Sequence, residues 1–150
     1  MLRLGILIGS LTFIAALSAN GQSLKFTKYE AKDCLQMAWE KENIIKNETE
    51  FLQKIRNDMS REGCLKILEK IDFNKHDLVG KDINSGYCRY PIGLTFEGSK
   101  NIEKKEFEVN ISYQKPNGVC RALSSYHLWL LIPKMPDEYK LRFNIYELKK

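Results

Sequence analysis

The stretch Glu106-Phe-Glu-Val-Asn-Ile-Ser-Tyr-Gln114 alternates strictly between polar and apolar side chains. Since successive side chains of a strand point to opposite faces of a sheet, this alternation predicts a β-strand with one buried and one hydrated face. Residues 127–132 are nearly continuously apolar and predict a central strand, while residues 141–145 alternate again and predict a last strand. The second half of the chain therefore predicts an antiparallel sheet.

The preceding residues, 30–75, are mainly helical in pattern. Apolar residues at helical spacing predict a short helix over Cys34–Trp39 and a second helix that stops near Gly63. The second helix is expected to begin at Asn47, because Asn47 and Glu50 have the spacing of a capping box. Ile44-Ile45 predicts a short strand between the two helices.

These patterns together predict the α+β class, with N-terminal helices followed by an antiparallel β-meander of four to five strands. No internal repeat or Pro/Ser-rich linker divides the chain after the first residues. We therefore expect residues 22–150 to form a single domain.

The first 21 residues have the layout of a cleaved signal peptide. Arg3 provides a positive start, Leu4–Leu17 carries no charge, and small residues follow at Ser18, Ala19 and Gly21. The apolar run is shorter than the roughly 20 residues that a membrane-spanning helix needs. Cleavage is expected after Gly21, with Ser18 and Ala19 as competing sites, and the mature protein is expected in the periplasm or outside the cell.

All four cysteines lie in the part predicted to be exported. Four cysteines in an oxidising compartment indicate two disulfides, for which three pairings exist. We favour Cys34–Cys64 in the helical half and Cys88–Cys120 in the strand-rich half. No two cysteines have the close spacing of a zinc site, so neither a metal nor another cofactor is predicted.

The charge pattern does not favour nucleic acid as the partner, and hydropathy predicts no membrane span after signal cleavage. The chain has 24 basic and 19 acidic residues, and mixed runs such as Lys100–Glu106 are typical of a hydrated surface. No stretch after the signal region is apolar enough to span a bilayer.

Known catalytic motifs are absent from the sequence. The two histidines, His76 and His127, are isolated, the first in a turn and the second in a strand. Glu106 and Glu108 fall on the hydrated face of their strand, where nothing would adapt them to acid–base catalysis. No catalytic residue is predicted.

The segment Asn84–Pro91 is the best candidate for a binding loop. Gly86 permits a tight turn, and Tyr87, Arg89 and Tyr90 surround a cysteine that would staple the loop. Tyrosine offers a large amphipathic contact area at a low entropy cost, which suits recognition. The alternative is that the two tyrosines only cover the edge of the sheet.

Several short motifs in the second half resemble the exported bacterial domain found in protease-complex subunits of the PrcB type. They are Ile71-Asp-Phe-Asn-Lys75, Gly86-Tyr87, a strand ending in Pro116, Gly118-Val-Cys-Arg-Ala-Leu123, Tyr126-His-Leu128 and Ile132-Pro-Lys134. Ser85 stands where that family has a second glycine. The resemblance covers residues 70–135 and implies a non-catalytic exported module that binds or stabilises a protease.

The sequence thus predicts a non-enzymatic exported binding module with a protein partner, for which the resemblance suggests a protease. Two alternatives remain open at this point. One is a small exported enzyme that uses His127 with a Glu or Asp of another strand. The other is a structural component of the cell envelope.

Overall fold

The computed structural model describes residues 21–31, 34–37, 43–84, 91–114 and 125–149. Within these residues the chain forms strands and two short helices, and it is mostly β. The strands are β1 (Gly21–Leu24), β2 (Thr27–Lys28), β3 (Asn43–Ile45), β4 (His76–Asn84), β5 (Ile92–Asn101), β6 (Glu106–Gln114), β7 (Ser125–Pro133) and β8 (Lys140–Leu148). The helices are α1 (Glu48–Lys54) and α2 (Arg61–Leu68).

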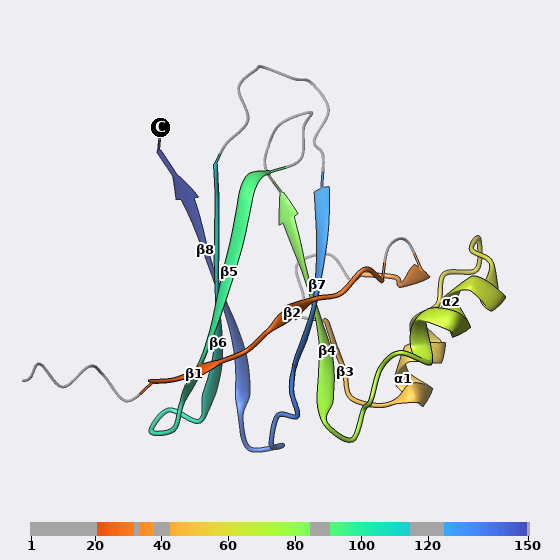
Figure 1. Ribbon diagram of the computed structural model, residues 1–150, viewed down its shortest axis with the longest axis horizontal. Coiled ribbons are helices and arrows are strands. Elements are labelled where there is room, and N and C mark those ends of the chain that lie inside the picture. The colour runs from red at the N-terminus through yellow and green to blue at the C-terminus, as the bar shows by residue number, and fades with distance from the viewer. Residues whose placement is uncertain (1–20, 32–33, 38–42, 85–90, 115–124, 150) are drawn as a thin grey trace, which may run out of the picture.

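The strands form two four-stranded sheets that face each other (Figure 1). Sheet A has the order β1-β5-β6-β8, and sheet B has the order β2-β7-β4-β3. Neighbouring strands are antiparallel, except that β6 and β8 are parallel. The chain changes sheets repeatedly, after β1, β4, β6 and β7, which makes the fold a β-sandwich.

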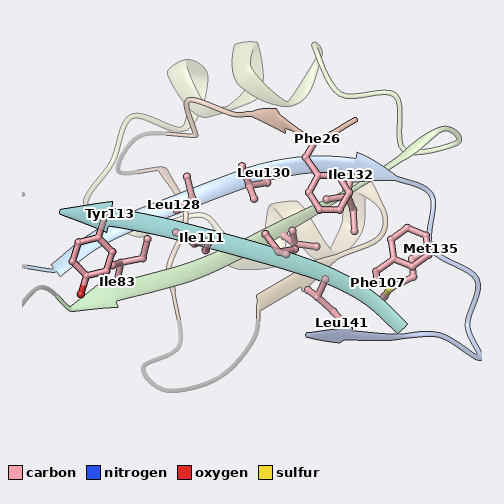
Figure 2. Packing of buried hydrophobic residues seen from close by; sticks show 12 residues of the cluster. Phe26, Ile83, Phe107, Ile111, Tyr113, Leu128, Leu130, Ile132, Met135 and Leu141 are labelled. Atoms are coloured by element: carbon pink, nitrogen blue, oxygen red, sulfur yellow. The ribbon is translucent and has the colours of Figure 1, made fainter. Parts of the chain in front are cut away.

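The main apolar core lies between the two sheets (Figure 2). Its inward-facing side chains come chiefly from β6 and β7, and β4, β8 and the segments next to the strands supply the rest. They are Phe26, Val79, Ile83, Phe107, Val109, Ile111, Tyr113, Leu128, Leu130, Ile132, Met135 and Leu141. The strand predicted from the alternation of residues 106–114 is therefore confirmed, because every second residue of β6 enters this core.

Sheet B also buries its other face, under α1 and α2 (Figure 1). The second cluster contains Ala31, Cys34, Leu35, Ile45, Phe51, Cys64, Leu68, Ile71, Leu78 and Trp129. A strand that is buried on both faces needs no polar alternation, and this explains the continuous apolar run of β7. The predicted central position of this strand is confirmed, since β7 lies between β2 and β4.

The Trp129 side chain lies directly against the backbone of the neighbouring strand at Gly80, its partner in register. A Cβ atom on Gly80 would lie only 2.6 Å from the indole ring. The residue at this position must therefore be glycine for the ring to pack as it does.

The capping box before α1 is confirmed. The Asn47 side chain accepts a hydrogen bond of 2.9 Å from the backbone N–H of Glu50. The Glu50 carboxylate reaches back and accepts from the backbone N–H of Lys46 at 2.7 Å. These bonds satisfy backbone donors that a helix start leaves free.

A buried carboxylate fixes the connection that leaves sheet B for sheet A after β7. Asp77, at the start of β4, is fully buried. Its Oδ1 lies 2.8 Å from Nζ of Lys134, and its Oδ2 accepts from the backbone N–H of Met135 at 2.9 Å. Lys134 Nζ also donates to the backbone carbonyl of Lys46, so one ammonium group joins β3, β4 and the end of β7.

The predicted α+β class is wrong. Strands β1, β2 and β3 precede both helices, which are short and cover one face of sheet B. The predicted meander is also wrong, because β6 and β8 are parallel neighbours and β4 pairs with β7 across the sequence. Period-two alternation identifies a strand, but it carries no information about which strand lies beside it.

The two predicted helices also differ from the structure. Of the first, over Cys34–Trp39, residues 38 and 39 lie outside the described residues, and Leu35 forms an isolated antiparallel bridge with Ile55 in place of a helical turn. The same bridge explains why α1 ends at Lys54, well before Gly63. Gly63 lies inside α2, where its backbone N–H donates to the side chain of the N-cap, Ser60, at 3.4 Å.

Candidate functional site

The predicted binding residues Tyr87, Arg89 and Tyr90 lie outside the described residues. The strands that flank them are described and show where this segment begins and ends. Asn84 pairs with Ser125 in sheet B, and Ile92 pairs with Gln114 in sheet A. We call this end of the sandwich, which also contains the end of β8, the loop end.

An irregularity in β5 changes the face of sheet A on which its first residue lies. The register of β5 with β6 shifts between Ile92 and Thr95, and Gly93 has a φ of 60°. Such a left-handed conformation favours glycine, which marks many β-bulges. Because of the shift, Ile92 lies opposite Gln114 on the outer face of the sheet, whereas Phe96 still faces the core.

The bulge completes an exposed apolar group, which we call the outer patch and define as Ile92, Tyr146 and Leu148. Ile92 and Leu148 flank Gln114 from either side, and Tyr146 lies beside Ser112 on the same face. Their exposed fractions are 48 %, 51 % and 45 %. Three large exposed apolar side chains at one end of an otherwise polar face indicate a contact surface.

Sequence reasoning missed the outer patch. The alternation of residues 141–145 identifies the inward-facing residues of β8. The two patch residues of this strand, Tyr146 and Leu148, follow that stretch and lie on the opposite face. The signal that was available is Gly93, since a glycine inside a strand pattern often marks a bulge.

The face of sheet B that lies toward the helices carries a histidine–carboxylate pair near the loop end. His127 and Asp82 are directly opposite each other on β7 and β4, and His127 Nδ1 lies 3.2 Å from Asp82 Oδ1. The histidine side chain is 43 % exposed and that of the aspartate is 14 % exposed. The contact is within ion-pair distance, but Asp82 Oδ1 makes no hydrogen bond there.

The expectation that His127 is a strand histidine is confirmed, and the carboxylate within reach is the one feature that favours an enzyme. The hollow found among the described residues lies elsewhere, on sheet A.

The hollow lies where β1 leaves β5 to cross toward sheet B. Its volume is about 550 Å³, it is open to solvent, and Ser23, Lys25, Glu97 and Asn110 contribute its polar lining. Lys25 and Glu97 place opposite charges in it.

The predicted Cys34–Cys64 disulfide is confirmed, with the two Cα atoms 5.6 Å apart. It joins the segment before the Leu35 bridge to α2, inside the cluster below sheet B. Cys88 and Cys120 lie outside the described residues. In the described part of the chain, no three His, Cys, Asp or Glu side chains are grouped in a way that would hold a metal ion.

Neither helix in the described ranges is long and apolar enough to cross a membrane. The chain matches no protein-family model, no curated protein and no solved structure. The site must therefore be interpreted from its own residues.

Proposed function

We propose that this chain is a non-enzymatic exported module that binds another protein through its loop end. The observation that carries the proposal is the outer patch, where the bulge at Gly93 turns Ile92 outward beside Tyr146 and Leu148. Aromatic and large apolar side chains that are exposed together are the usual anchors of protein interfaces. Tyr87 and Tyr90 belong to the segment that enters β5 immediately before this patch.

Two features support export. The first 21 residues have the charge and hydropathy pattern of a signal peptide. The Cys34–Cys64 disulfide fits a compartment in which disulfides form and persist.

The partner that we propose is a protease, on the basis of the resemblance to the PrcB-type domain. The described motif residues have mainly structural positions: Tyr126-His-Leu128 lies within β7, and Ile132-Pro-Lys134 spans its end. Since these motifs specify the fold, we propose that contact specificity comes from Gly86-Tyr87 and the residues next to them in the sequence.

The test is capture of partners by the mature protein from its own exported fraction, followed by affinity measurement with the partner identified. Tyr146→Ala and Tyr87→Ala are each expected to weaken binding about thirtyfold, which corresponds to roughly 2 kcal/mol for an aromatic anchor. Ile102→Ser is the control, because Ile102 is also an exposed apolar residue, at 57 %, but lies in the turn between β5 and β6. The thermal midpoint should stay the same in all three variants.

Unchanged affinity in both tyrosine variants would refute the loop end as the binding surface. Equal losses in the Ile102 control would show that the apolar contact is unspecific. Capture of a partner that is not a protease would retain the binding function and reject the proposed partner.

A second candidate function is a small exported enzyme, and the His127–Asp82 pair is the specific observation in its favour. If this function is correct, the mature protein hydrolyses at least one substrate in a panel of peptides and esters, and His127→Ala abolishes that activity. Partner affinity unaffected by His127→Ala, with no turnover in the wild-type protein, would favour the binding module.

A further inference from the structure

The edge strands of the two sheets differ greatly in length. Among the described strands, β1, β2 and β3 are edge strands of four, two and three residues. The remaining edge strand, β8, has nine residues and pairs in regular register with β6 along its whole length. Proteins usually keep edge strands short, bulged or interrupted by proline, because a long regular edge can accept another strand.

The exposure of β8 fits an edge that is open to a further strand. Within sheet A, β6 is the described neighbour of β8, so the backbone groups on its other side have no described strand partner. The strand contains no proline and no register shift. Ile145 points toward the core side but is still 40 % exposed, because β8 lies at the margin of the sheet.

The middle residues of β8 make favourable pairs with those of a second β8 that runs antiparallel to it. A two-fold axis at Asn144, the middle residue, pairs all nine positions and keeps the same face of each sheet outward. On the core side this register places Phe143 opposite Ile145, an aromatic and β-branched pair of the kind that stabilises neighbouring strands, and Leu141 opposite Glu147 towards the ends.

The outer face of the same register is also favourable. Arg142 lies opposite Tyr146, where a guanidinium and an aromatic ring attract each other, and Asn144 faces its own copy. Lys140 lies opposite Leu148, and no position brings two like charges together. A shift that centres the axis on Arg142 would place two arginines against each other, so the charges discriminate between registers.

From this edge geometry and self-complementarity we infer that β8 pairs with β8 of a second copy and joins two sheets A into one continuous sheet. The occupant is a second copy because the middle of the strand makes favourable pairs with itself, Phe143 with Ile145 and Arg142 with Tyr146, and because no two like charges meet in this register. The inference does not rest on the proposed function, since it is argued from the edge of β8, although Tyr146 and Leu148 of the outer patch belong to the same strand.

The first test measures the mass of the mature protein by sedimentation over a range of concentrations. A concentration-dependent dimer is expected for the wild-type protein. Ile145→Lys should raise the dissociation constant at least about tenfold, because a charge at the centre of the strand pair replaces an apolar contact. Ile102→Lys makes the same change at an exposed isoleucine of the turn between β5 and β6, outside the edge strand, and should leave the dimer intact.

The second test uses the two-fold axis directly. Asn144→Cys should form a disulfide-linked dimer, because residue 144 faces its own copy. Asn110→Cys is a matched control: the Asn144 amide donates to the Asn110 side chain at 2.9 Å, so both variants lose the same hydrogen bond, but Asn110 lies on β6 inside the sheet. Non-reducing peptide mapping should locate the new link at residue 144.

A wild-type protein that remains monomeric into the millimolar range would overturn the inference. The open edge of β8 would then be expected to pair with a strand of a different protein. It would also be overturned by a dimer that survives Ile145→Lys, or by equal cross-linking of the two cysteine variants.

Discussion

Sheet B is buried on both faces, whereas sheet A is buried on one. In sheet B, the side chains of Leu128 and Leu130 of β7 lie in the sandwich core, and that of Trp129 lies in the second cluster, between sheet B and the helices. The corresponding central strand of sheet A, β6, places Glu108 and Asn110 on an outer face that no described helix covers. Sheet B is thus enclosed by the rest of the protein, whereas the outer face of sheet A remains on the surface.

The edges of the sheets follow the same division. The edge strands of sheet B, β2 and β3, are two and three residues long, and one edge of sheet A is the nine-residue β8. The outer patch and the self-complementary strand both belong to sheet A. We therefore expect substitutions in sheet B to change the free energy of unfolding, and substitutions on the exposed positions of sheet A to change association.

The largest expected effect is that of Trp129→Ala. Removing a fully buried aromatic side chain leaves a cavity and typically lowers the free energy of unfolding by about 3–5 kcal/mol. Tyr146→Ala removes an aromatic side chain of sheet A that is 51 % exposed, and its effect should stay within about 0.5 kcal/mol. Chemical denaturation of both variants measures the difference, and equal losses would contradict the division between the two sheets.

The next largest effect is expected for the double variant Cys34→Ala, Cys64→Ala. The disulfide closes a loop with a sequence separation of 30, and such loops contribute about 2–4 kcal/mol, chiefly by restricting the unfolded chain. Reversible unfolding measures this loss of free energy, which should exceed the loss on replacing either residue of an exposed ion pair. A variant as stable as the wild type would show that packing alone maintains the cluster below sheet B without the Cys34–Cys64 disulfide.

The elements that local pattern determines were predictable from the sequence. The strands β6, β7 and β8 follow from alternation and from a continuous apolar run, and the start of α1 follows from Asn47 and Glu50. The Cys34–Cys64 pair was also predicted, although its cysteines are 30 residues apart and the helical half on which the pairing was argued is not helical at Leu35. The strands and the start of α1 depend on residues that are near one another in the sequence.

The arrangement of the elements was not predictable in this way. β1 and β2 are short, and they are defined by pairing with β5 and β7, far along the chain, so their own residues carry little signal. Leu35 had helical spacing but pairs with Ile55, because tertiary contacts override a short periodic pattern. The outer patch depends on a register shift, and the His127–Asp82 pair depends on which strands are neighbours.

A smaller effect should distinguish two glycines that each lie beneath an aromatic ring. A Cβ on Gly80 would lie 2.6 Å from the Trp129 ring, and a Cβ on Gly98 would lie 2.4 Å from the Phe26 ring. Overpacking costs about 1–3 kcal/mol where the neighbour cannot move. Gly80→Ala should fall at the upper end, because Trp129 is enclosed in sheet B, whereas Gly98→Ala should cost less, since Phe26 lies at the margin of the sandwich next to the open hollow.

Thermal unfolding of the two alanine variants, each compared with the wild type, checks this order. A lower midpoint for Gly98→Ala than for Gly80→Ala would mean that the crossing between β1 and β2 is as rigid as the middle of sheet B.

The smallest effect concerns an exposed ion pair that links the two sheets. Lys46, just after β3, lies with its Nζ 2.6 Å from Asp137 Oδ1, in the connection that leads to β8. The hydrogen bond from Lys46 lowers the pKa of Asp137 below its ordinary value, and the same bond raises the pKa of Lys46. Since the pKa of the carboxyl is lowered in the folded state, its stabilisation is present above the unfolded pKa and is lost as the pH falls through the folded pKa.

The substitution Lys46→Met should therefore return the pKa of Asp137 toward its ordinary value, as measured by NMR titration of the carboxyl carbons. The pKa of Asp72, which Lys75 holds low in a separate pair, should not change and serves as the internal control. Because Asp137 is almost fully exposed, the thermal midpoint at neutral pH should hardly move. An unchanged pKa of Asp137 would show that this pair does not link the sheets in solution, and that the buried contacts of Asp77 with Lys134 and Met135 hold the connection alone.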